Sequence, residues 1–192
     1  MFSDPWLERW LPLVAKRGST FPVLEIGCGY GDDTSTLAEA GFDVVAFDLS
    51  AACVAATKLR VPRARVMQRD ARAPLPVGDG EVGAVIASLS LHYFPWRETL
   101  SIVDGIRNAL GEAGVLLCRL NSTEDRNFGA GTGVELENNY FEYEGQTKRF
   151  FDRETVAELF GPGWRVLSME HMNTGKYFRQ KSLWEVVAQK AA

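Results

Sequence analysis

A glycine-rich turn between an apolar strand and a helix constrains the fold of this chain more than any other feature. The segment from Val23 to Asp33 reads VLEIGCGYGDD, so a short apolar run leads into Gly27, Gly29 and Gly31. Glycines at such a turn let the backbone bend sharply and lie against a ligand. The following helix N-terminus adds free N–H groups and a partial positive charge. The segment therefore predicts a strand–turn–helix unit with a ligand at the turn.

Short apolar runs alternate with amphipathic segments along the rest of the chain, which predicts an α/β fold with a mostly parallel sheet. The expected strands are residues 23–26, 43–47, 64–68, 82–88, 115–120, 164–169 and 183–188. The expected helices are residues 32–40, 51–60 capped by Ser50, 95–110 ended by Gly111, and one capped by Asp152. A first helix is expected from Asp4 and Pro5, with Pro12 kinking or ending it. The turn signal at residues 173–175 makes the last two strands an antiparallel hairpin at a sheet edge.

Length and composition favour a single domain, residues 1–192, in the cytoplasm. The longest apolar stretch, residues 82–91, is far short of the roughly 20 residues that span a bilayer, and no signal peptide is predicted. Three cysteines without a C-x-x-C motif and only two histidines predict neither disulfides nor a metal site. The 25 acidic residues outnumber the 21 basic ones, which makes a nucleic-acid partner improbable. The oligomeric state is left open.

Acidic residues lie at the tips of three successive strands and indicate the kind of ligand. Asp48 comes about 23 residues after Glu25 and is placed for ribose hydroxyls, as in dinucleotide folds. Asp70 ends the third strand and is suited to an adenine amino group. The spacing G-x-G-x-G and the two carboxylates Asp32 and Asp33 disfavour a dinucleotide, because the carboxylates would repel a pyrophosphate. Glu25 suits a ligand with a positive amine instead.

These motifs resemble those of class I S-adenosylmethionine-dependent methyltransferases: VLEIGCGYG, Asp48 in FDLS, Asp70 in QRDAR and residues 88–93. The resemblance covers nearly the whole chain, and its last part is similar to small stand-alone members of the tellurite-resistance and related small-molecule type. It implies a Rossmann-like three-layer sandwich with a seven-stranded, mostly parallel sheet and an antiparallel C-terminal strand. It also implies S-adenosyl-L-methionine as cofactor and S-adenosyl-L-homocysteine as product. The cofactor-binding residues that it implies are Glu25, Gly27, Gly29, Asp48, Leu49, Asp70, Ala71 and Ser88.

Methyl transfer from a sulfonium mainly needs alignment and exclusion of water, and it needs a general base only when the nucleophile must lose a proton. His92 follows the fourth strand and is the candidate base, with a purely structural role as the alternative. Tyr93, Trp96 and Asn121 are candidates for binding the acceptor, with core packing or loop hydrogen bonding as their alternatives.

Two segments are candidates for covering the site. Residues 122–150 are rich in glycine, acids and aromatics and are interpreted as a lid or insertion over the acceptor, or else as a solvated loop. Residues 1–20 are expected to form a helical cover that carries Trp6 and Trp10.

The favoured function is methylation of a small molecule, and two alternatives stay open. One is an RNA or protein methyltransferase that uses a local basic patch, formed by Arg60, Arg63, Arg65, Arg69 and Arg72. The other is a non-catalytic S-adenosylmethionine-binding module. The chain lacks the [N/D]-P-P-[Y/F] motif of amino-methylating enzymes and the Pro-Cys nucleophile of cytosine C5 enzymes. A nicotinamide dehydrogenase is disfavoured by the glycine spacing.

Overall fold

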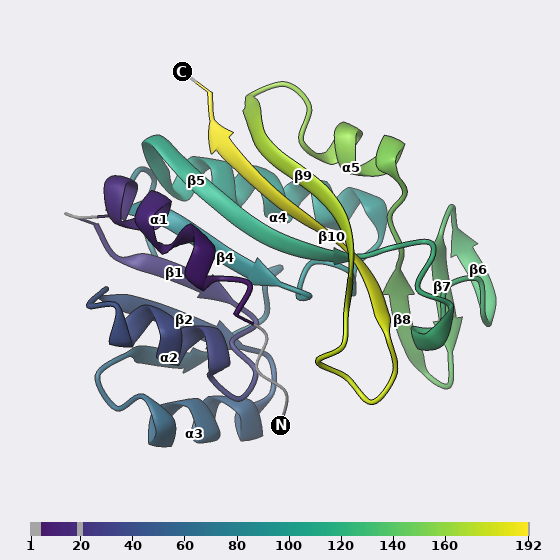
Figure 1. Cartoon of the computed structure of the whole chain (residues 1–192), viewed down its shortest axis with the longest axis horizontal. Coiled ribbons are helices and arrows are strands. Elements are labelled where there is room, and N and C mark those ends of the chain that lie inside the picture. Colours follow the sequence, from purple (N-terminus) through teal and green to yellow (C-terminus); the bar gives the residue numbers. More distant parts are fainter. Residues whose placement is uncertain (1–4, 19–20, 192) are drawn as a thin grey trace.

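A computed structural model describes residues 5–18 and 21–191 of the chain. Its centre is a seven-stranded sheet with the order β3-β2-β1-β4-β5-β10-β9 (Figure 1). The strands are β1 (Val23–Ile26), β2 (Val44–Asp48), β3 (Arg65–Gln68), β4 (Val82–Ser88), β5 (Leu110–Asn121), β9 (Trp164–Thr174) and β10 (Lys181–Lys190). Strand β10 is antiparallel to β5 and to β9, while the other pairings are parallel. This topology confirms the predicted Rossmann-like sheet with its antiparallel C-terminal strand.

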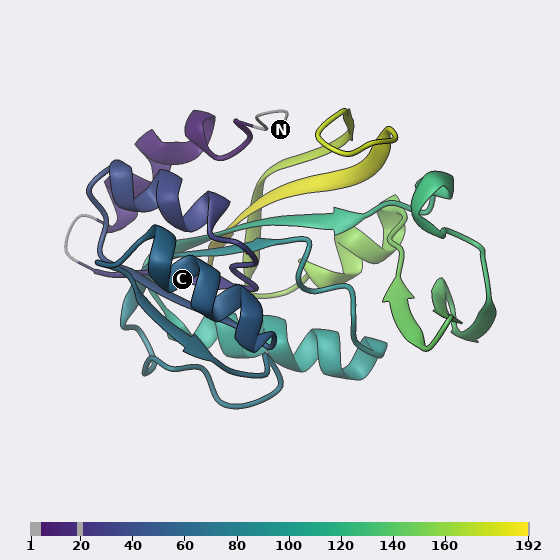
Figure 2. The same cartoon turned by 90° about the horizontal axis from the view of Figure 1, so that it is seen from below.

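Helices cover both faces of the sheet and form the outer layers of the sandwich (Figure 2). One face carries α1 (Leu11–Gly18), α2 (Asp32–Glu39) and α3 (Ala51–Arg60), and the other carries α4 (Trp96–Ala109) and α5 (Arg153–Leu159). Successive strand residues point to opposite faces, so Val23 packs with α1 and α2 while Leu24 packs with α4 and α5. Within the described residues, no helix has both the length and the apolar character that crossing a membrane requires.

The predicted helix caps after β2 and before α5 are confirmed. The Ser50 side chain accepts a hydrogen bond from the backbone N–H of Cys53 at the start of α3. Asp152 and Thr155 form a reciprocal capping box at the start of α5. Each cap satisfies N–H groups that the first helical turn leaves free.

Three predicted boundaries need correction. Pro12 neither kinks nor ends a helix, because it lies in the first turn of α1, where a missing N–H costs no hydrogen bond. A short 3-10 turn, η1 (Glu8–Trp10), precedes α1, and the expected cap Asp4 lies outside the described residues. Gly111 does not end a helix, since α4 stops at Ala109 and Leu110 is already extended and paired with Val82 in the sheet.

The segment expected as a lid or loop contains regular structure. It holds a 3-10 turn, η2 (Arg126–Phe128), and a three-stranded antiparallel sheet, made of β6 (Val134–Glu137), β7 (Tyr140–Tyr143) and β8 (Gln146–Arg149). This small sheet lies beyond the carboxyl ends of β4 and β5 (Figures 1 and 2). The N–H of Arg149 donates to the carbonyl of His92 over 2.7 Å, and the Tyr140 hydroxyl donates to the carbonyl of Tyr93 over 3.2 Å. The small sheet is therefore fastened to the loop that follows β4.

Candidate functional site

The glycine turn after β1 has a backbone that only glycine adopts without strain. Gly27 and Gly29 have φ angles of +75° and +51°. A Cβ atom on Gly27 would lie 2.5 Å from the Cβ atom of Ser90, so a side chain there would collide with the loop after β4. A Cβ atom on Gly29 would meet no other atom within 4 Å. Gly29 therefore leaves room beside the turn for a ligand.

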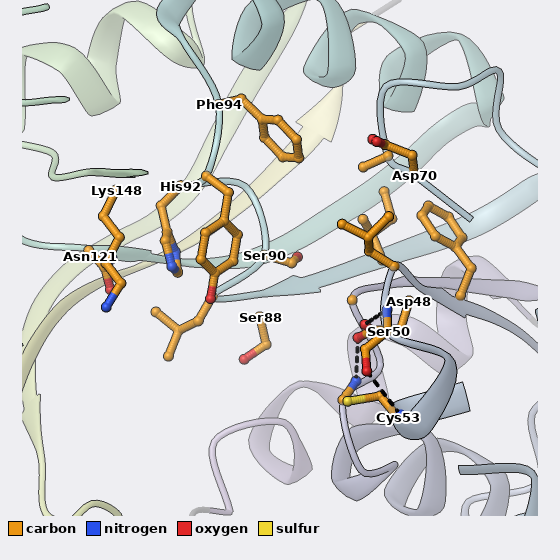
Figure 3. Close-up of a pocket in the computed structure, with 18 of the residues that line it drawn as sticks. Asp48, Ser50, Cys53, Asp70, Ser88, Ser90, His92, Phe94, Asn121 and Lys148 are labelled. Carbon is orange, nitrogen blue, oxygen red and sulfur yellow. Dashed lines mark hydrogen bonds between the residues drawn. The ribbon is translucent and has the colours of Figure 1, made fainter. Parts of the chain in front are cut away.

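A cavity of about 730 Å³ opens at the carboxyl ends of the parallel strands, beside the glycine turn (Figure 3). Ligands of open α/β sheets bind at this edge. The structure brings together on its wall the following residues singled out by the sequence: Gly27, Gly29, Asp48, Leu49, Asp70, Ala71, Ser88, His92, Tyr93 and Asn121. This cavity is the candidate functional site.

Two carboxylates mark one end of the cavity (Figure 3). Asp48 accepts hydrogen bonds from the backbone N–H groups of Gly29 and Ser50, both at 2.9 Å. Asp70 accepts from the side chain and the backbone of Arg72, with Nη2 at 2.6 Å from Oδ2. The Arg72 guanidinium lowers the pKa of Asp70, so both its oxygens are acceptors at neutral pH.

Glu25 is not on the cavity wall, although the sequence groups it with the cofactor-binding residues. Its side chain is buried and accepts a hydrogen bond from the Thr34 hydroxyl in α2. Burial is the main cause that raises its pKa well above the usual range, and Asp33 adds to the effect. Glu25 therefore lies among the residues that support the turn.

His92, Asn121 and Lys148 lie at the other end of the cavity (Figure 3). Within the part of the chain that the structure describes, the buried atoms Nδ1 of His92 and Oδ1 of Asn121 have no hydrogen-bond partner. Burial, with smaller contributions from Lys181 and Lys148, lowers the pKa of His92 well below 6.5, so the ring is neutral at pH 7. Buried polar atoms normally have hydrogen-bond partners, so His92 and Asn121 each carry an unsatisfied polar atom just behind the cavity wall.

The segments after β5 add Phe128, Lys148, Tyr177 and Lys181 to this wall, and the sequence did not single out any of them as a site residue. Phe128 comes from η2, Lys148 from β8, and Tyr177 and Lys181 from the hairpin of β9 and β10. Nζ of Lys181 lies 2.6 Å from Oδ2 of Asp125 and 4.6 Å from the centre of the Phe128 ring. Lys181 could have been identified from the sequence, because it is the lysine that begins the largely apolar strand KSLWEVVA. Lys148 stands in a polar segment and could not have been identified in this way.

Trp96, predicted to bind the acceptor, does not line the cavity. Its ring lies against the guanidinium of Arg149, 5.4 Å from centroid to Cζ, and its backbone N–H donates to Glu137 over 2.8 Å. Trp96 therefore helps to fasten the small sheet to the start of α4.

The described part of the N-terminal cover, residues 5–18, contributes nothing to the wall of this cavity. Trp6 donates its ring N–H to Asp33 over 2.9 Å, and Trp10 donates to Glu185 over 2.7 Å. The segment thus packs on one face of the sheet, next to the start of α2 (Figure 1).

Three of the five arginines considered as a basic patch form ion pairs with acids, and Arg63 and Arg69 form none among the described residues. The ion pairs are Arg60 with Asp32, Arg65 with Asp43, and Arg72 with Asp70. Paired guanidinium groups offer less net charge to a polyanion than free ones.

Comparisons with known proteins agree with this geometry. Residues 23–114 match the family model described as a methyltransferase domain. An uncharacterized methyltransferase of Synechocystis is 36% identical over 93 residues, which cover 48% of this chain and 43% of that protein. The chain therefore spans less than half the length of the curated relative that it matches.

Two solved structures illustrate the fold. A methyltransferase of Methanosarcina mazei, described as dependent on S-adenosylmethionine, superposes with a TM-score of 0.78 at 14% identity, over 99% of both chains. A Burkholderia thailandensis 1,6-didemethyltoxoflavin N1-methyltransferase superposes with a TM-score of 0.73 at 18% identity, over 98% of this chain and 82% of that one. The latter structure contains 1,6-didemethyltoxoflavin and S-adenosylhomocysteine. At these identities the likeness is one of fold.

Proposed function

We propose that this chain is a class I S-adenosylmethionine-dependent methyltransferase that methylates a small molecule in the cavity described above, since residues 23–114 match the methyltransferase-domain model. The cofactor of this class is S-adenosyl-L-methionine, and S-adenosyl-L-homocysteine is its product. The observation that carries the proposal is one cavity that joins the glycine turn and Asp48 at one end to the unpartnered polar atoms of His92 and Asn121 at the other.

The residues at the carboxylate end fit S-adenosylmethionine. The open space beside Gly29 leaves room for the methionine part. Asp48 would accept hydrogen bonds from the ribose hydroxyls, because each carboxylate oxygen keeps a lone pair beyond its backbone bond. Asp70 would accept from the adenine amino group, and Leu49 and Ala71 would flank the adenine ring. We place Ser88 on the wall near the methionine part.

Glu25 would influence the cofactor from below the turn. Because it is buried and bonded to Thr34, it holds the start of α2 against β1. Its effect on the cofactor amine would pass through the turn rather than through direct contact.

The bound sulfonium supplies a methyl group that is already activated. The chain's tasks are then to align the acceptor in line with the methyl–sulfur bond and to keep water out. Tyr93 and Asn121 would position the acceptor. Neutral His92 would take a proton from the acceptor when its nucleophilic atom carries one.

The size of the cavity and the pairing of the surface arginines favour a small acceptor over RNA or a protein. A volume of about 730 Å³ lies in the range of small-molecule sites. Three of the surface arginines, Arg60, Arg65 and Arg72, are held by Asp32, Asp43 and Asp70. The Burkholderia neighbour holds bound 1,6-didemethyltoxoflavin, which is consistent with this proposal.

The test is calorimetry followed by a turnover screen. We expect S-adenosylhomocysteine to bind the purified chain, and NAD to bind much more weakly. A panel of small acceptors, with release of S-adenosylhomocysteine as the readout, should then give turnover. Absence of S-adenosylhomocysteine binding would contradict the proposal, and binding without turnover on every acceptor class would favour a non-catalytic module.

A further inference from the structure

Lys148 carries a charge that no described residue balances. It lies on β8, is partly buried, and reaches the wall of the cavity at the end occupied by His92 and Asn121 (Figure 3). Among the described residues, no acid forms an ion pair with its side chain and no acceptor receives a hydrogen bond from its Nζ. Lysines that line cavities in this state are suited to binding an anionic ligand.

We propose that Lys148 binds an oxyanion group of the methyl acceptor, so that the acceptor is an aromatic acid with a carboxylate or a phosphate ester. This inference rests on the proposed function, because it assigns the chemistry of the acceptor in the same cavity. It makes Lys148 a specificity-determining residue contributed by the small sheet.

The charges around this end of the cavity leave one positive charge in excess. Lys181, the other lysine on the wall, is neutralised by the buried carboxylate of Asp125 at 2.6 Å. The acids on the wall, Asp48 and Asp70, lie at the opposite end and are themselves held by backbone N–H groups and by Arg72 (Figure 3). A ligand oxyanion beside Lys148 would supply the missing counter-charge.

Aromatic side chains surround the same end and favour a flat body for the ligand. Tyr93, Phe128 and Tyr177 line the wall, and the rings of Phe128 and Tyr177 meet edge to face with centroids 5.5 Å apart. Aromatic rings of a ligand stack or pack edge-on against such side chains. A charged group attached to an aromatic ring would satisfy both features at once.

A second cavity of about 560 Å³ shares two wall residues, Lys148 and Phe128, with the first. Its wall adds Arg126 and Arg179 and only one acid, Glu144. Lys148 therefore lies between two spaces that both have an excess of positive charge. The oxyanion of the acceptor would lie on this side, with the methylated atom directed toward the first cavity.

The experiment compares charged and neutral ligands of one shape. The full chain is saturated with S-adenosylhomocysteine, and the dissociation constants of benzoate and phenyl phosphate are measured by ligand-observed NMR. Benzamide and benzyl alcohol are the neutral counterparts. The variants are Lys148→Gln, the conservative Lys148→Arg, and Lys58→Gln as a matched control on the exposed surface of α3.

We expect the wild-type chain to bind at least one acid about tenfold more tightly than its neutral counterpart, since a charge-assisted hydrogen bond has about this strength. Lys148→Gln should abolish the preference, whereas Lys148→Arg and Lys58→Gln should keep it. If benzoate loses more affinity than phenyl phosphate in Lys148→Gln, the oxyanion is a carboxylate; if phenyl phosphate loses more, it is a phosphate.

Equal binding of acids and neutral ligands to the wild type would overturn the proposal, as would a preference that survives in Lys148→Gln. Failure of both acids to bind would overturn it too. Calorimetry with S-adenosylhomocysteine on the same samples separates this outcome from failure of the proposed function. If that ligand does not bind, the proposed function fails, while titration of the acids into the free chain still tests Lys148.

Discussion

The backbone N–H of Gly29 donates a 2.9 Å hydrogen bond to Oδ2 of Asp48, so the acid that ends β2 holds the glycine turn that follows β1. The other carboxylate oxygen of Asp48 accepts from the N–H of Ser50 at the start of α3. One side chain therefore fixes two backbone segments that border the cavity. Any ligand contact made by Asp48 is made from a position already set by these bonds, which limits the entropy lost on binding.

Replacing Asp48 with Ala should weaken the binding of S-adenosylmethionine by roughly 1.5–3 kcal/mol, because ribose hydroxyls lose a charged acceptor. Asp48→Asn should cost less, since one oxygen remains to accept from Gly29 or a hydroxyl. Calorimetry gives the affinities, and thermal unfolding identifies variants that have lost their fold. Unchanged affinity in a folded Asp48→Ala variant would remove Asp48 from the cofactor site.

Replacing Asp70 with Ala should weaken cofactor binding less than the Asp48 change, because Arg72 already occupies the Asp70 carboxylate. Arg72→Gln is the matched variant, since it breaks the same ion pair and leaves the carboxylate in place. We expect the affinity for S-adenosylhomocysteine to fall more in Asp70→Ala than in Arg72→Gln. Equal losses would mean that Asp70 acts only through the ion pair.

Features encoded in neighbouring residues were predictable from the sequence. The glycine turn, the strands around it and the acid that follows β2 all depend on local backbone preference and apolar periodicity. For this reason the sheet and the cavity-lining positions of Gly27, Gly29 and Asp48 followed from the chain alone. The type of acceptor, the tellurite-resistance likeness and the cytoplasmic location stay predictions.

Features that depend on distant segments were not predictable in the same way. Lys148 and Tyr177 reach the cavity only because the small sheet and the β9–β10 hairpin fold back over the strand ends. Trp96 was misplaced because its partner Arg149 lies far along the chain. The start of β5 was missed because Leu110 is extended through its pairing with Val82, which local propensity does not encode.

Replacing His92 with Gln should lower turnover by about 10²–10⁴-fold if the acceptor loses a proton, while the affinity for S-adenosylhomocysteine should hardly change. His92 is neutral at pH 7 because burial, Lys181 and Lys148 lower its pKa well below 6.5. As pH falls, the loss of kcat/KM that accompanies protonation of His92 should therefore appear only at pH values well below 6.5. A fall centred near 6.5 or above, or intact turnover in His92→Gln, would exclude His92 as the base.

Replacing Glu25 with Gln should change how stability depends on pH. In the unfolded chain Glu25 ionises near pH 4.5, but in the folded chain its pKa is raised well above that value, chiefly by burial. The contribution of Glu25 to stability is thus fully present below pH 4.5 and is lost as pH rises toward the folded pKa. Gln does not titrate and still accepts from Thr34. In urea unfolding, the free energy of unfolding of Glu25→Gln should rise relative to that of the wild type as pH rises from 4.5. If the two free energies change with pH in parallel, the burial of an ionisable Glu25 is contradicted.

Replacing Lys176 with Gln should speed the release of S-adenosylhomocysteine. Nζ of Lys176 lies 3.2 Å from Oδ2 of Asp32, so the hairpin turn that carries Tyr177 is tied to the first turn of α2 beside the glycine loop. A partly exposed ion pair contributes about 0.2–1 kcal/mol, which corresponds to a dissociation rate up to about fivefold faster and little change in thermal unfolding. Stopped-flow measurement of release should show this change for Lys176→Gln but not for Lys58→Gln. High salt should reproduce it in the wild type, because screening weakens the same pair. An unchanged rate in both experiments would mean that the Lys176–Asp32 pair does not hold the hairpin over the cofactor.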